Sequence, residues 1–543
     1  MVPIGSGGGL AHDAIVVGAG HNGLAAAIIL AKAGWDVLVL ERNSEPGGAV
    51  RTAEVTLPGF HHDLYAANLN LFAGSPFFAE FGDELTAHGL EFAHSSKPFS
   101  SVFPGGGFIG VSTDLDETLA MVGEYSKADV IAWRSLYERF ETIAPHLFPL
   151  LGTPLPSMAA LRILWSGARS LGREWLFDLA RLVVQSTREF AEEHFESRET
   201  RALCAVWGMH LDFPPDVAGG ALFPFIETFA DSANGMVLGK GGASAMIDAL
   251  VSLLESFGAE VRLNANVESI IVEEGRAVGV VVGGGERLLA RRAVIANLTP
   301  KVLFGGLVAD THLSDRFRGR VRAYKHAPGT MMIHLAMDDL PPWIAEAARE
   351  YAYVHIGPYM EDMSLAYQQA VAGLLPERPT LVVGQPTAVD PSRAPDGKHV
   401  LWVQVRMVPG IISGDAAGTI ESPVWDQAKE WYADRVLDII ESHAPGTLSR
   451  VSGRHVMAPT DIEAGNPNLI GGDSLGGSHH LMQHFFLRPF PGWTRYRTPI
   501  KDLYMCGAGT WPGAGVGAGS GYLLGKRLEA RSRLAGARAR FSN

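Results

Sequence analysis

The sequence is nearly free of cysteine. Its 543 residues contain only Cys204 and Cys506, which stand far apart in the chain. Two distant cysteines build neither a disulfide framework nor a C-x-x-C redox pair, so dithiol reductase chemistry is excluded. Cys506 is expected to be a small buried hydrophobe rather than a nucleophile. We therefore expect a protein of a reducing compartment, the cytoplasm.

The sequence also has fewer basic than acidic residues. Lys and Arg number 45 against 58 Asp and Glu, which gives a net charge of -13. Binding to a nucleic-acid backbone depends on Lys and Arg side chains that neutralise phosphates. This acidic balance predicts that nucleic acid is not a partner.

Long apolar runs are missing as well. The most apolar early stretch, residues 25–40, is interrupted by Lys32, Gly34 and Asp36. It is shorter than the ~20 apolar residues that span a bilayer. Residues 1–12 are rich in glycine and lack the basic and apolar regions of a signal peptide, so they predict a loose leader. We expect no transmembrane helix.

The histidines do not follow a metal-binding pattern. His480 and His484 are four residues apart, but no acid nearby completes a set of ligands. We therefore predict no metal site, and we expect the histidines to be structural or to line a pocket.

A dinucleotide-binding motif is present near the start of the chain. Gly18, Gly20 and Gly23 form G-x-G-x-x-G between an apolar strand at 13–18 and a small-residue helix at 24–33, and Asn22 lies inside the motif. A second strand, 36–40, ends at Glu41. The glycines allow a tight turn and a close approach to a pyrophosphate, and the helix N-terminus faces its charge. Glu41 is expected to accept hydrogen bonds from the adenosine ribose.

A second glycine motif follows the ribose acid. After Arg42 come Gly47, Gly48 and Arg51, which offer another backbone approach and a cation for the diphosphate. A Pro-Gly-Gly turn with a solvated arginine is the alternative interpretation. Together with the first motif, the pattern favours a cofactor-binding role.

The C-terminal region contains a third glycine-rich segment. A strand at 503–506 leads into residues 507–521, and a helix is predicted from Tyr522 onward. Glycines at 513, 515, 517, 519 and 521 let a helix N-terminus approach a ligand, and its N–H groups suit a negatively charged one. The segment predicts a cover over the bound cofactor.

These motifs together resemble the phytoene desaturase and carotenoid ketolase group of FAD-dependent oxidoreductases, a branch of the amine oxidase superfamily. A central Gly239–Gly242 segment and the strand end at residues 296–300 agree with that resemblance. By resemblance, FAD is the cofactor, and the residues implied as its contacts beyond the first two motifs are Val267, Asn297, Gly507, Gly509, Gly515 and Val516. One departure is Trp511 after Gly509-Thr510, where related desaturases carry His. It puts a polyene substrate in doubt.

The resemblance and the element order together predict an α/β fold. A Rossmann-type FAD-binding domain is built from residues 1–75, 236–300 and 458–543. An α+β substrate domain is inserted in two pieces, a largely helical part at 76–235 and a mixed-sheet part at 301–457. A chain of this length exceeds one hydrophobic core, which agrees with two domains.

The predicted activity is dehydrogenation, or desaturation, of a hydrophobic organic small molecule by hydride transfer to flavin N5. Ketolase-type oxygenation, amine oxidation and a flavin-bearing binding protein without turnover remain alternatives. The glycines at 105–107 and 283–285 fit hairpin turns, so no nicotinamide site is predicted. The electrons must then pass to oxygen, a quinone or another carrier, and no motif assigns the acceptor. No residue is assigned as a catalytic base, and the oligomeric state stays open.

One helical segment has an unusual surface. Leu164, Trp175 and Leu182 lie on one face of a helix predicted across 162–182, with Arg162 and Arg169 on the other. Packing against the protein's own core is the favoured interpretation. Peripheral contact with a membrane is the alternative, since Trp and Arg suit the lipid interface.

Overall fold

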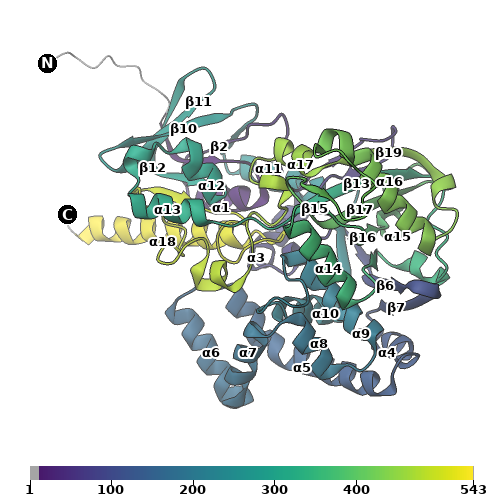
Figure 1. Cartoon of the computed structure of the whole chain (residues 1–543). Helices are drawn as coiled ribbons and strands as arrows, with labels where there is room; N and C mark the ends of the chain where they lie inside the picture. Colours follow the sequence, from purple (N-terminus) through teal and green to yellow (C-terminus); the bar gives the residue numbers. More distant parts are fainter. Residues whose placement is uncertain (1–10, 542–543) are drawn as a thin grey trace.

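The computed structural model of the chain describes residues 11–541 (Figure 1). Most of the glycine-rich leader predicted at residues 1–12 lies outside the described residues. Its last two residues are part of the first strand, which begins at Ala11 rather than at Asp13.

The first sheet contains seven strands from distant parts of the chain. Its parallel strands lie in the order β20, β12, β1, β2 and β9. The antiparallel hairpin of β10 and β11 joins the early part of β12. The bounds are β1 Ala11–Val17, β2 Val37–Leu40, β9 Glu260–Arg262, β10 Val267–Glu273, β11 Arg276–Val282, β12 Glu286–Ala296 and β20 Leu503–Met505.

Three helices from separate regions pack beside one another on this sheet. They are α1 (His21–Lys32), α11 (Ser244–Ser256) and α18 (Gly519–Phe541). In α1 the small and aliphatic side chains of Leu24–Ala31 are all buried, because the helix lies between the sheet and the two other helices. The chain order therefore brings the first, central and last segments into one α/β layer, as the predicted fold class requires.

The second sheet also has seven strands, in the order β19, β13, β17, β16, β14, β6 and β7. Pairing is antiparallel except between β14 and β6. The bounds are β6 Phe99–Phe103, β7 Gly107–Val111, β13 Gly329–Met337, β14 Tyr353–Ile356, β16 Thr380–Gly384, β17 His399–Val408 and β19 Val451–Met457. The glycines at 105–107 and 283–285 lie at β6–β7 and β11–β12 connections, as predicted. The domain boundaries given above stay predictions.

A helical region lies below the two sheets in Figure 1. Its helices are α4 Leu115–Gly123, α5 Lys127–Leu151, α6 Met158–Leu171, α7 Glu174–Val184, α8 Thr187–His194, α9 Arg198–Ala205 and α10 Leu222–Asn234. The prediction of a single helix across 162–182 is wrong. The helix is interrupted between α6 and α7 at Gly172, whose φ of 90° is outside helical geometry.

Among residues 11–541, no helix is both long and apolar enough to cross a membrane.

Candidate cofactor and substrate cavity

The turn between β1 and α1 is built by the glycines of the first motif. Gly18 has a φ of 97°, which an L side chain rarely adopts, and its N–H donates to the carbonyl of Leu40 at 2.7 Å. A Cβ on Gly23 would overlap the carbonyl oxygen of Gly18, so only glycine lets the helix lie this close to the strand. The helix begins at His21, three residues earlier than predicted, because the glycine motif itself forms its first turn.

Glu41 is held in place by backbone donors. The residue is buried, and its carboxylate accepts one hydrogen bond from the Ala19 N–H and one from the Asn43 N–H, each at 3.0 Å. The acid thereby joins the glycine turn to the end of β2. A carboxylate has about four acceptor sites, so two amides leave capacity for ribose hydroxyls.

A single cavity of about 420 Å³ borders these residues and continues to the second sheet. The predicted cofactor residues that line it are Gly18, Gly20, Asn22, Glu41, Arg42, Gly47, Gly48, Val267, Asn297, Gly507, Gly515 and Val516. Gly23, Arg51 and Gly509 do not line it. Arg51 instead pairs with Glu45 at 2.8 Å.

The C-terminal segment closes on the start of the chain. The Gly521 N–H donates to the Asn22 side-chain oxygen at 3.1 Å, and the Gly507 N–H donates to the Ser520 hydroxyl at 3.0 Å. Helix α18 begins at Gly519, three residues before the predicted start. The Ala514 N–H donates to His479 Nε2 at 3.0 Å, which fixes the approach to Gly515. The first and last helices thus begin beside each other.

Asn297, at the end of β12, connects the motifs. Its side-chain amide lies 3.4 Å from the carbonyl oxygens of Gly18 and Gly20. Beside it, Cys506 is fully buried, and this burial raises the pKa of its thiol. The cysteine is therefore an unreactive packing group, as predicted.

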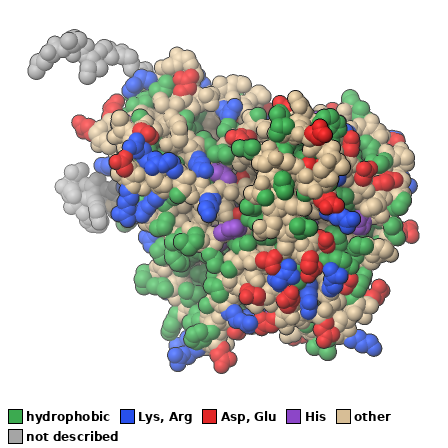
Figure 2. Space-filling model, viewed as in Figure 1, with side chains coloured by type: hydrophobic (Ala, Val, Ile, Leu, Met, Phe, Trp, Pro, Cys, Tyr) green, Lys and Arg blue, Asp and Glu red, His purple; other side chains and the backbone are tan. Residues whose placement is uncertain are grey.

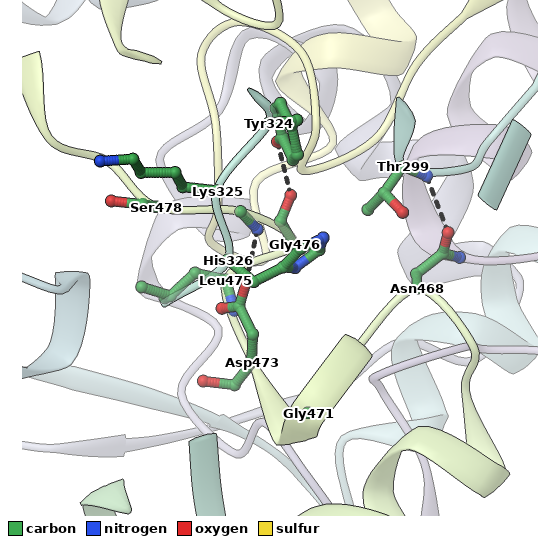
Figure 3. A network of polar contacts seen from close by, with 12 residues as sticks. Thr299, Tyr324, Lys325, His326, Asn468, Gly471, Asp473, Leu475, Gly476 and Ser478 are labelled. Atoms are coloured by element: carbon green, nitrogen blue, oxygen red, sulfur yellow. Dashed lines mark hydrogen bonds and ion pairs between the residues drawn. The ribbon is translucent and has the colours of Figure 1, made fainter. Parts of the chain in front are cut away.

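A loop that sequence reasoning did not single out forms one wall of the cavity. Figure 3 shows polar contacts of this loop. Asp473 anchors it: its carboxylate lies 2.8 Å from His326 Nδ1 and accepts the N–H groups of Leu475 and Gly477. Five residues before Asp473, the side-chain oxygen of Asn468 accepts a hydrogen bond from the Thr299 N–H at 2.7 Å. The loop residues that line the cavity are Asn466, Pro467, Asn468, Leu469, Ser474, Leu475 and Gly476.

The opposite wall is aromatic. Tyr353 on β14 and Trp402 on β17 stack with their ring centroids 5.5 Å apart and their planes 8° from parallel. The Trp402 indole N–H donates to the Tyr65 carbonyl at 3.0 Å, which fixes the ring. Trp207 and Met332 complete this apolar surface.

Arg406 is the buried cation of the cavity wall. Its guanidinium donates to the carbonyls of Met209 and His210 and to the hydroxyls of Thr330 and Ser474. Burial lowers the pKa of Arg406 to about 10. With its donors used by the protein, Arg406 supplies a fixed positive field rather than a free binding group.

Glu227, on α10, is a second charged group that the sequence reasoning missed. Its carboxyl lines the cavity, and among residues 11–541 no hydrogen-bond donor pairs with it. Burial raises its pKa to about 7. One turn later lies Asp231, whose pKa is raised by burial and by the charge of Glu227. The available signal was two acids four residues apart within an aromatic, apolar helix.

The described residues include no cluster of three or more His, Cys, Asp or Glu side chains arranged to hold a metal ion. The cavity does match an extended dinucleotide. It runs from Glu41 past glycines with no Cβ and the N-terminus of α1 to the aromatic wall.

Comparisons with known proteins also indicate a flavin-binding protein. The model of the family "Flavin containing amine oxidoreductase" matches residues 23–527. The chain is 30% identical to "Pyridine nucleotide-disulfide oxidoreductase domain-containing protein 2" of Rattus norvegicus, covering 94% of this chain and 92% of the relative. It is 25% identical to a phytoene desaturase of Fusarium fujikuroi, covering 92% and 86%. The structure of putrescine oxidase bound to putrescine aligns with a TM-score of 0.59 at 18% identity, covering 97% and 99%, which shows the shared fold.

Proposed function

The chain belongs to the flavin containing amine oxidoreductase family, and from that premise we propose that it dehydrogenates a hydrophobic organic substrate. FAD is the cofactor of this family of oxidoreductases. When bound, FAD supplies a hydride acceptor at N5. We assign the ribose to Glu41 and the diphosphate to the α1 N-terminus and the glycines at 18, 20, 47 and 48.

The observation that supports a hydrophobic substrate is the wall opposite the cofactor motifs. Tyr353, Trp402, Trp207 and Met332 present aromatic and aliphatic surface to the same cavity that the glycine motifs border. Removing apolar surface from water contributes roughly 25 cal/mol per Å². A substrate with a large apolar body therefore gains most of its binding free energy from this wall.

Removal of hydrogen from a substrate releases a proton together with the hydride, and the proton needs an acceptor. Glu227 is the unpaired carboxyl of the cavity, and its pKa of about 7 allows it to be deprotonated at neutral pH. Glu41 is already occupied by two backbone amides, and the His210 ring lies 3.1 Å from His355. We assign the role of proton acceptor to Glu227.

The test is a substrate screen under anaerobic conditions that follows the loss of oxidised flavin absorbance. Unsaturated and saturated terpenoid hydrocarbons, long-chain alcohols and amines form the panel. Bleaching by an uncharged apolar compound supports the proposal. Flavin that no compound reduces would instead favour a binding protein without turnover.

Amine oxidation is the second candidate, and Glu227 is the specific observation that favours it. A buried carboxylate without a partner is a counter-ion for a substrate ammonium group. If amines alone bleach the flavin, and Glu227→Gln raises their KM far more than it lowers kcat, the carboxylate binds the amine. A loss in kcat with apolar substrates supports the proton-acceptor role instead.

A further inference from the structure

Helices α6 and α7 expose large apolar side chains to solvent. Trp165 is 65% exposed and Phe177 is 75% exposed. The other exposed apolar residues of the pair are Met158, Leu161, Leu176 and Val184. Figure 2 shows hydrophobic side chains gathered at the lower left, where Figure 1 places α6. We call these six residues the outer face.

The outer face does not take part in packing α6 and α7 onto the protein. The opposite, inner side of the pair makes these contacts. Trp175 lies against Gly167, where a Cβ would overlap the indole, and its ring centroid lies 5.7 Å from that of His146 on α5. Ala160 and Leu182 are buried on the same inner side. The predicted packing on the protein's own core therefore accounts for one side only.

Charge on these helices opposes that of the whole chain. Residues 158–184 contain four Arg against one Glu and one Asp, although the chain has a net charge of -13. Within the described structure, Arg162, Arg169 and Arg173 form no ion pair with an acid. The Arg169 guanidinium lies 5.5 Å from the Trp165 ring centroid. Apolar side chains and unneutralised cations thus share one surface.

The chain that leads into α6 packs against the segment that follows Leu71. Leu71 both lines the cavity and is 45% exposed, so the cavity reaches the surface beside it. In the connection from α5 to α6, the Trp511 indole N–H donates to the Thr153 carbonyl at 2.8 Å, and Gly152 lies against Pro76.

We propose that the outer face of α6 and α7 docks on an anionic lipid bilayer. Trp165 and Phe177 enter the interface between headgroups and acyl chains, and the three unpaired arginines contact lipid phosphates. Docking against a second copy of the chain is less favourable, because a two-fold contact brings together two surfaces that carry the same unneutralised arginines. This inference concerns the outer face alone and holds whichever substrate the cavity accepts.

The experiment is flotation of the full-length, flavin-loaded protein with vesicles of phosphatidylcholine alone or with added phosphatidylglycerol. We expect binding to the anionic vesicles, and we expect it to weaken with salt. Trp165→Ser with Phe177→Ser should lower the bound-to-free ratio at least about tenfold. The matched control is Trp431→Ser with Ile411→Ser, two side chains that are 54% and 83% exposed on other elements. It should bind as the wild type does.

Retained flavin absorbance and an unchanged melting temperature show that each variant is folded. Arg162→Glu with Arg169→Glu tests the charge separately and should abolish the preference for anionic vesicles. The proposal is overturned if the wild type ignores anionic vesicles, or if the Trp165 and Phe177 double variant floats equally well. Self-association that this double variant abolishes, without vesicle binding, would assign the face to a second copy.

Discussion

The side-chain oxygen of Asn22, at the start of α1, accepts a hydrogen bond from the N–H of Gly521 at 3.1 Å across 499 residues of sequence. This contact joins the first and last segments of the α/β layer formed by the first sheet with α1, α11 and α18, which we call the cofactor layer. It places two helix N-termini side by side. Gly20, just before α1, and Gly515, four residues before α18, line the same cavity.

Replacing Gly521 tests this junction. A Cβ at that position would overlap the Asn22 backbone, so Gly521→Ala must push α18 away from α1. Overpacking of this kind costs about 1–3 kcal/mol, and we expect a lower melting temperature with loss of flavin during gel filtration. Gly306→Ala is the control, because a Cβ there meets open space. Equal stability of the two variants would contradict the proposed junction.

Glu41→Ala should weaken FAD retention while the chain stays folded. The substitution removes the acceptor of the Ala19 N–H and the acceptor that we assign to the ribose hydroxyls, and an unsatisfied buried donor costs about 1–3 kcal/mol. The measurement is the FAD content after dilution and gel filtration. Glu45→Ala, at an exposed acid nearby, should keep its flavin. A Glu41→Ala protein that remains stoichiometrically yellow would remove Glu41 from the ribose site.

If Glu227 accepts the proton, the rate of flavin reduction should depend on pH. Because the pKa of Glu227 is about 7, the rate should rise about tenfold per pH unit below that value and level off above it. Glu227→Gln should lower the rate by about 10²-fold or more and remove this dependence. Anaerobic stopped-flow mixing with a reducing substrate measures both. A glutamine variant with the wild-type profile would show that the proton goes elsewhere.

The raised pKa of Glu227 also makes the free energy of unfolding depend on pH. Between the ordinary carboxyl pKa of 4.5 and about 7, the folded chain keeps a proton that the unfolded chain has released. The contribution of Glu227 to stability therefore falls as pH rises through this window. Chemical denaturation at several pH values should show a smaller decline in Glu227→Gln than in the wild type. Glu255→Gln, at an exposed acid on α11, should behave as the wild type.

Gly515→Val should lower the flavin midpoint potential, provided that FAD still binds. A Cβ at Gly515 would lie 2.5 Å from the Leu71 Cδ1, and its φ of 111° strains any L residue, so the nearby N–H groups must shift. Hydrogen bonds to a charged group contribute roughly 1.5–3 kcal/mol, and reduced flavin carries the greater negative charge. A redox titration against a reference dye measures the change. Gly397→Val, also at positive φ but in open space, should leave the potential unchanged.

Much of the cofactor layer could be predicted from local sequence. Strand, glycine turn, helix and acid follow one another within residues 11–41, so hydrophobic periodicity and the need for missing Cβ atoms identify them without tertiary information. The same reasoning found the last strand and helix. It placed the start of α1 and of α18 three residues late, because glycines normally interrupt helices and only packing against neighbours keeps them helical.

The other side of the cavity was decided by tertiary structure alone. Glu227, Trp402 and the Asp473 loop stand in three distant regions, and no local pattern distinguishes them from core residues. The break at Gly172 likewise turns one predicted stripe into two helices, with Trp175 inside and Trp165 outside. The sequence by itself determined which glycine segments gather at the cavity that we assign to a dinucleotide, because that chemistry needs only backbone close to phosphate. Only folding decided which side chains lie across the cavity from these segments, because burial and the pKa of a carboxyl depend on every element packed around it.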